Sequence, residues 1–194
     1  MCGILIDQIQ DKPFIGQIIQ YLKTKANSRA QLNGLANILS QSPVPAVGLI
    51  LTDRLVNVPS EVVPPMYNML LEEIEWAVQE KEPYHFTHYL ILSKTYTEIE
   101  SKLDAEDDRP KKKKKAGGGA FETMYFHPED QVFQKHALSY GGFDYSTKRD
   151  EGHSDSKRAF QEMGIKPQSH AILIEASKFK AAVEEVAQFL KPPS

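Results

Sequence analysis

Apolar residues recur every three or four positions in two successive stretches between residues 14 and 40. The first stretch carries Phe14, Ile15, Ile18, Ile19 and Leu22, and the second carries Leu32, Leu35, Ile38 and Leu39. This spacing is typical of helices with one buried face. We therefore predict two helices over residues 14–40. Ser28 is suited to cap the second helix, and the prolines at 43 and 45 end it.

Other segments have the pattern of strands. Residues 46–52 and 170–174 are continuous apolar runs rich in branched side chains, which favours strands buried on both faces. Residues 85–96 alternate and are aromatic, and residues 120–126 resume this character. The last two segments predict a hairpin with a long tip. Residues 138–140 are a further short strand, which Gly141 and Gly142 are expected to break by a turn or bulge.

Three more helices follow from the pattern, over residues 61–81, 128–137 and 178–190. Pro64 and Pro65 belong in a first turn, so the longest helix is expected to begin near Val63. Strands and helices alternate, so we predict an α/β (or α+β) fold. The expected architecture is a single domain over residues 14–194, with a mixed central sheet flanked by helices.

Residues 101–119 interrupt this order. An acidic stretch from Asp104 to Asp108 is followed by five lysines and then by three glycines. Such a segment has no apolar surface to bury, so we expect a disordered loop. Lys111, Lys112, Lys113, Lys114 and Lys115 form a candidate nuclear-import signal. A loop that only aids solubility explains the same lysines equally well.

Net charge, cysteine content and the lengths of apolar stretches exclude several classes of protein. The 194 residues carry a formal net charge of −3, which does not fit a dedicated DNA-binding protein with a broad positive face. The single cysteine, Cys2, excludes a disulfide scaffold and a cysteine-ligated zinc site, and favours a reducing compartment. No apolar stretch approaches the ~18 residues of a membrane span, and we see no signal peptide.

The predicted helix over residues 61–81 carries a cluster of acidic side chains. Glu72, Glu73, Glu75 and Glu80 form a candidate acidic face for binding a client protein. An ordinary solvated helix face is the alternative interpretation. A basic partner would complement the acidic charge of the whole chain.

Motifs for catalysis or cofactor binding are weak. His85 and His88 are three residues apart in a predicted strand and point to opposite faces, so we expect no metal site there. No nucleophile elbow and no phosphate-binding glycine motif occurs. Residues 161–166 resemble the pyrophosphate turn of GNAT acetyltransferases. However, Lys166 replaces a small residue, Pro167 lacks an N–H group, and a strand is predicted to follow.

Several stretches together resemble the BCCIP family of nuclear proteins, especially its fungal branch. They are residues 47–59, 64–76, 89–96, the lysine loop, 125–130, 141–145 and the final strand and helix from Ile172. The resemblance runs from about Phe14 to Leu190. Its ordered combination is more specific than any single piece.

The resemblance implies a GNAT-like shape without a working cofactor turn, no cofactor, and a non-enzymatic role. It implies a protein that shuttles between nucleus and cytoplasm, acts as chaperone for a basic large-subunit ribosomal protein, and meets import and export receptors. In the fungal branch it also implies a link to nuclear export of a phosphoinositide kinase. Animal members bind a breast-cancer susceptibility protein and a cyclin-dependent-kinase inhibitor. No membrane and no direct nucleic acid are expected as partners.

The start of the chain departs from this family. Relatives begin with an acidic arm and extra strand-like segments, whereas residues 1–12 show neither. We expect a disordered start over residues 1–13, an exposed sheet edge, and either a late gene start or a fragment. Two other functions stay open at this point, namely a GNAT-type acyltransferase and a nucleic-acid-binding protein that uses the lysine loop.

Overall fold

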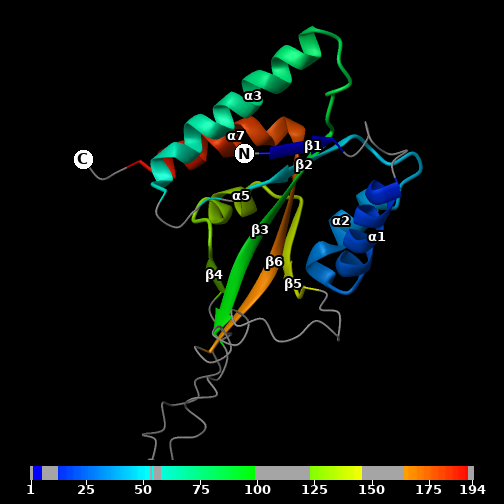
Figure 1. The fold of residues 1–194 in the computed structure, drawn as a ribbon, viewed down its shortest axis with the longest axis vertical. Helices are drawn as coiled ribbons and strands as arrows, with labels where there is room; N and C mark the ends of the chain where they lie inside the picture. Colours follow the sequence, from blue (N-terminus) through cyan, green and yellow to red (C-terminus); the bar gives the residue numbers. More distant parts are fainter. Residues whose placement is uncertain are drawn as a thin grey trace, which may run out of the picture.

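A six-stranded mixed sheet forms the centre of the molecule (Figure 1). The computed structural model describes residues 2–5, 13–52, 54, 58–98, 123–145 and 164–191. Its strands are β1 (Cys2–Leu5), β2 (Val47–Leu51), β3 (His88–Glu98), β4 (Thr123–Tyr125), β5 (Ser139–Phe143) and β6 (Ile165–Glu175). Their order is β1-β2-β3-β6-β5, with β4 beside β3. Only the β2–β3 pair is parallel among these strands, so the predicted mixed sheet is confirmed.

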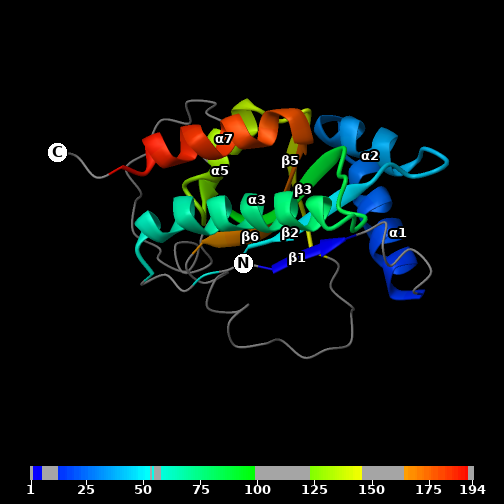
Figure 2. The same cartoon turned by 90° about the horizontal axis from the view of Figure 1, so that it is seen from above.

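Helices cover both faces of this sheet (Figure 2). They are α1 (Pro13–Asn27), α2 (Asn33–Leu39), α3 (Val63–Gln79), α5 (Asp130–Lys135) and α7 (Ala176–Phe189), with short 3-10 turns at Ala30–Leu32 and Ser60–Val62. Helices α1 and α2 lie on one face, and α3, α5 and α7 lie on the other. On that second face, α3 and α7 run side by side in opposite directions. The predicted start of α3 at Val63 is confirmed.

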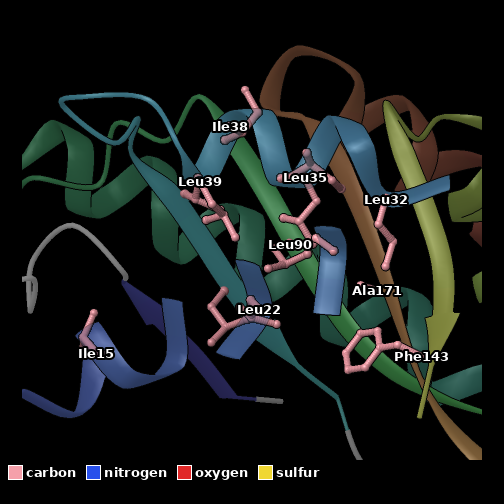
Figure 3. Close-up of a cluster of buried hydrophobic side chains, with 14 residues drawn as sticks. Ile15, Leu22, Leu32, Leu35, Ile38, Leu39, Leu90, Phe143 and Ala171 are labelled. Atoms are coloured by element: carbon pink, nitrogen blue, oxygen red, sulfur yellow. The ribbon is translucent and has the colours of Figure 1, made fainter. Parts of the chain in front are cut away.

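Alternation along the strands divides the apolar residues between two cores. Leu49 and Leu90 belong to the core under α1 and α2. Figure 3 shows Leu90 among the side chains of this core. Ile50 and Ile91, their neighbours in the sequence, belong to the core under α3, α5 and α7. Because successive strand residues point to opposite faces, a continuous apolar run serves both cores. This confirms the prediction of strands buried on both sides.

Two strands share one edge of β3. Strand β2 pairs with residues 88–92, and β4 pairs antiparallel with residues 95–97. The predicted hairpin of β3 and β4 is therefore confirmed, while its expected loop over residues 101–119 lies outside the described residues. Ser93 and Lys94 lie on β3 between the two partners. Buried polar side chains meet at this point.

Three expectations about local structure are wrong. Gly141 and Gly142 do not break a strand, because β5 continues through them in register with Ala171 and His170 of β6. Pairing along β6 outweighs the low strand propensity of glycine. Strand β6 begins at Ile165, five residues before the predicted start at residue 170, because it pairs with β3 over its whole length. Ser28 does not cap α2, which begins at Asn33; its hydroxyl donates instead to the carbonyl of Lys25.

The start of the chain also differs from the expectation at Cys2–Leu5. These residues form β1, antiparallel to β2, inside the stretch 1–13 for which we predicted disorder. Backbone pairing to the edge of β2 explains this order, and it makes β1 the terminal strand of the sheet. Within the described part of the chain, no helix has the length and apolar character needed to cross a bilayer.

Candidate functional site

The acidic residues singled out on the longest helix all reach solvent. Glu72, Glu73, Glu75 and Glu80 are exposed on α3 or at its end. They do not form a single face, however. Glu75 follows Glu73 by two residues and is therefore turned by about 200° around the helix axis. Only Glu73 among the four borders the groove described next.

An apolar groove of about 390 Å³ runs between α3 and strand β2. Its floor is formed by residues 48–50 of β2, and its helix side by residues of α3 that include Ile74 and Trp76. Tyr84, Phe86 and Tyr89 close the remaining wall. The groove is thus lined mainly by aliphatic and aromatic side chains, as binding sites commonly are.

Gly48, on the floor of this groove, has no side chain to fill it. A Cβ atom at this position would lie 3.0 Å from Cδ1 of Tyr89 and 3.3 Å from Cδ1 of Phe86. Neither ring has room to retreat easily, because the Tyr89 ring packs at 4.4 Å against Phe179 and at 5.4 Å against Phe86. The absence of a side chain at Gly48 therefore helps to shape the groove.

The C-terminal turn of α3 returns the chain to the groove. The N–H of Glu82 donates to the carbonyl of Ala77, and the N–H of Lys81 donates to that of Val78. This is a Schellman motif, in which the residue after the cap adopts a left-handed conformation. Lys81 has that conformation, with φ of 64°, although glycine is preferred there. As a result, Glu82 borders the groove, as Glu73 does.

The charge of the groove is entirely negative among its described lining residues. Glu73 and Glu82 are the only acidic residues in that lining, and no lysine, arginine or histidine belongs to it. Trp76 is 66% exposed, and Met69, two turns earlier on the same side of α3, is 59% exposed. The arrangement can therefore hold an apolar side chain that lies next to a positive charge.

A second group of polar residues is buried where β2 and β4 meet β3. The hydroxyl of Ser93 donates to Oδ2 of Asp130 at 2.5 Å and lies 3.2 Å from Nδ1 of His127. The same ring nitrogen lies 3.3 Å from the hydroxyl of Thr52. His127 lies shortly before α5 in the sequence. In the structure it joins β2, β3 and α5.

Serine, histidine and aspartate together raise the question of a hydrolytic triad. In such a triad the serine hydroxyl bonds to one ring nitrogen of histidine, and the other nitrogen bonds to the acid. Here Ser93 bonds directly to Asp130 and approaches Nδ1 of His127. All three side chains are at most 4% exposed. This geometry stabilises the joint between the strands and offers no accessible nucleophile.

An ion pair completes this buried group. The two terminal guanidinium nitrogens of Arg54, Nη1 and Nη2, donate to the two carboxylate oxygens of Glu129, whose side chain is only 2% exposed. The hydrogen bond to Glu129 raises the pKa of Arg54. Burial raises the pKa of Asp130 to about 7, although the hydrogen bond from Ser93 acts in the opposite direction. Asp130 is thus able to hold a proton near neutral pH.

The remaining sequence-level candidates lie apart from these two regions. Strand β3 begins only at His88, so His85 lies before it, and the described residues contain no group of three side chains suited to a metal ion. After Gly164 the chain continues as strand β6, as predicted, and Pro167 lies within that strand. Lys111 to Lys115 and residues 161–163 lie outside the described residues.

Sequence reasoning missed most of the groove and all of the buried group. Glu82 and Tyr84 stand in an irregular segment between α3 and β3, where no periodicity marks them. Phe86 belongs to the predicted strand over residues 85–96, but it lies before the start of β3. Ser93 was a usable signal, since it is a polar residue in the middle of an apolar strand. Its partners His127 and Asp130 are 34 and 37 positions away, and only the fold brings them together.

Comparison with known proteins identifies relatives over most of the chain. A family model described as BCCIP matches residues 4–133. Protein bcp1 of Emericella nidulans is 61% identical over 183 residues, which cover 94% of this chain and 63% of that protein. Protein bcp1 of Aspergillus oryzae is 55% identical over 188 residues, which cover 97% of this chain and 65% of that protein.

A solved structure agrees with this relationship at the level of fold. The crystal structure of BCP1 from Saccharomyces cerevisiae matches with a TM-score of 0.56 and 19% identity, over 97% of this chain and 63% of that one. At this identity the match bears on the fold alone. The chain spans just under two thirds of the length of these relatives.

Proposed function

The chain belongs to the BCCIP family, and from that premise we propose that it is a non-enzymatic nuclear chaperone or transport adaptor for a basic client, such as a large-subunit ribosomal protein. Its shape would be GNAT-like without a working cofactor turn. It would shuttle between nucleus and cytoplasm with import and export receptors, and a phosphoinositide kinase is a further candidate cargo.

The acidic surface of α3 beside an apolar groove is the observation that carries this proposal. A ribosomal protein presents a cationic surface that binds RNA. An acidic partner can cover that surface until the ribosomal protein is delivered to its RNA site. Exposed glutamates of α3, with Glu73 beside the groove, supply such charge. The groove adds apolar contact, which gives the binding more selectivity than charge alone provides.

A direct test uses purified basic large-subunit ribosomal proteins and this chain. We expect complexes by size-exclusion chromatography, and less precipitation of the client when RNA is added. The affinity should fall as salt rises, since charge pairs at exposed sites are screened. Polyglutamate of similar net charge is the control for unspecific shielding. Failure to bind any of these proteins more tightly than polyglutamate does would contradict the proposal.

The import role of the lysine run is tested separately. Replacing Lys111 to Lys115 by alanine should leave thermal unfolding unchanged and should reduce nuclear accumulation of a fluorescent fusion. Unchanged accumulation would assign these lysines to solubility only. Micromolar binding of acetyl-coenzyme A by calorimetry would support the acyltransferase alternative instead. RNA binding that disappears with the lysines would support the nucleic-acid alternative.

A further inference from the structure

We propose that the groove between α3 and β2 is the specific docking site for a short apolar-basic segment of the client. This inference rests on the proposed function and adds the place and the chemistry of binding. One aromatic or branched aliphatic side chain would enter the groove. A lysine or arginine next to it would pair with Glu73 and Glu82.

The shape of the groove supports an inserted side chain. The volume of about 390 Å³ has a floor at Gly48 and an aromatic wall of Tyr84, Phe86 and Tyr89. These rings pack edge-on or tilted against one another, with centroid distances of 6.1 Å for Tyr84 and Phe86 and 5.4 Å for Phe86 and Tyr89. A wall held in this way is already organised before binding, which lowers the entropy cost of complex formation.

The charge of the groove selects the kind of partner. Glu73 of α3 and Glu82, which follows the end of that helix, both line the apolar space, with no basic residue among the described lining. Charges beside apolar walls act through a lower dielectric than charges in open water, so their attraction for a cation is stronger. An anionic membrane surface would be repelled. A second copy of the chain that docked through the same face would place its own acidic groove against this one, and the like charges would repel.

Trp76 is the expected anchor on the protein side. It lines the groove, is 66% exposed, and is the only tryptophan in the chain. Exposed tryptophans at the edge of an apolar groove are typical binding hot spots, because contact with a partner buries a large ring at small entropy cost. The single tryptophan also makes its fluorescence a direct reporter of the groove.

The first measurement uses an array of overlapping 15-residue peptides that cover basic large-subunit ribosomal proteins. Peptides that bind the intact chain are then titrated in solution, and we expect a blue shift of the Trp76 emission. Changing the aromatic or aliphatic residue of such a peptide to alanine should weaken its binding about tenfold. Changing its basic residues to glutamine should weaken binding and remove most of the salt dependence.

The matched variants of the protein are Glu73→Lys and Glu75→Lys. Both add the same charge to α3, but only Glu73 borders the groove. We expect Glu73→Lys to weaken binding about tenfold or more, and Glu75→Lys to change it about twofold or less. Trp76→Ala should weaken binding about tenfold, and Trp76→Phe should restore part of it. Thermal unfolding by circular dichroism checks that each variant folds.

The outcomes separate this inference from the broader function. Equal effects of Glu73→Lys and Glu75→Lys would overturn the docking site, and client binding by the intact chain would still support the chaperone role. Tighter peptide binding after replacement of Lys111 to Lys115 by alanine would make the chain's own lysines the occupant, and would also overturn it. Absence of client binding in the intact chain would contradict the proposed function itself.

Discussion

Two acidic regions of this molecule differ in what surrounds their carboxylates. Glu129 and Asp130, at the start of α5, are at most 2% exposed and bond to Arg54 and Ser93. Glu73 and Glu82 flank an open groove and have no such partner among the lining residues. In the first region the carboxylates are paired with side chains of the same fold. In the second region they stay accessible to a binding partner. Charge in a sequence therefore says little about function until its partners are known.

The largest effect should come from breaking the buried pair. Arg54→Met leaves the carboxylate of Glu129 buried without its partner, so we expect the free energy of unfolding to fall by about 3 kcal/mol. Urea unfolding followed by circular dichroism measures this change. Glu75→Gln, on the exposed side of α3, should change stability by less than about 0.5 kcal/mol.

A double variant sharpens this result. Arg54→Met combined with Glu129→Leu removes both charges, and we expect it to recover much of the lost stability, because no unpaired carboxylate remains. Equal losses in the single and the double variant would show that the pair contributes through packing. In that case the buried region would differ from the groove in packing, and the pairing of its charges would not explain its stability.

The second prediction concerns pH and Asp130. Its folded pKa of about 7 lies above the ordinary value of 3.8, so the folded state retains a proton that the unfolded state releases. This contribution to stability is present below about pH 4 and is lost as pH rises through 7. The slope is at most about 1.4 kcal/mol per pH unit for one proton. Asp130→Asn should therefore become more stable relative to the wild type as pH rises from 4 to 7.

Urea unfolding of both proteins across that range measures the difference. The neighbouring charges of Arg54 and Glu129 are present in both proteins, so the difference isolates Asp130. Parallel stability curves would show that Asp130 is ionised throughout.

The smallest effect is expected at the floor of the groove. Gly48→Ala places a methyl group 3.0 Å from Tyr89, whose ring is held by Phe86 and Phe179, so we expect a loss of about 1 kcal/mol. Gly16→Ala in α1 is the matched control, because nothing lies within 4 Å of its added methyl group. That change should stabilise the protein by about 1 kcal/mol. Thermal or urea unfolding of both variants decides whether Gly48 has a packing role.

Local pattern predicted much of the fold and little of the candidate site. The helices at residues 14–40 and the start of α3 at Val63 followed from apolar spacing and proline chemistry, both of which act within a few residues. The continuation of β5 through Gly141 and Gly142 did not, because distant pairing with β6 decides it. The same holds for β1, which is ordered by its contact with β2.

The sequence by itself determined the alternating helices and strands, the apolar strands buried on both faces, the acidic character of α3 and the family relationship. These depend on residue type and near-neighbour spacing. Only the tertiary structure decided that Glu73 borders a groove while Glu75 does not, and that Ser93, His127 and Asp130 are sealed inside. Both results depend on which distant side chains the sheet and helices bring into contact, and no local pattern specifies that.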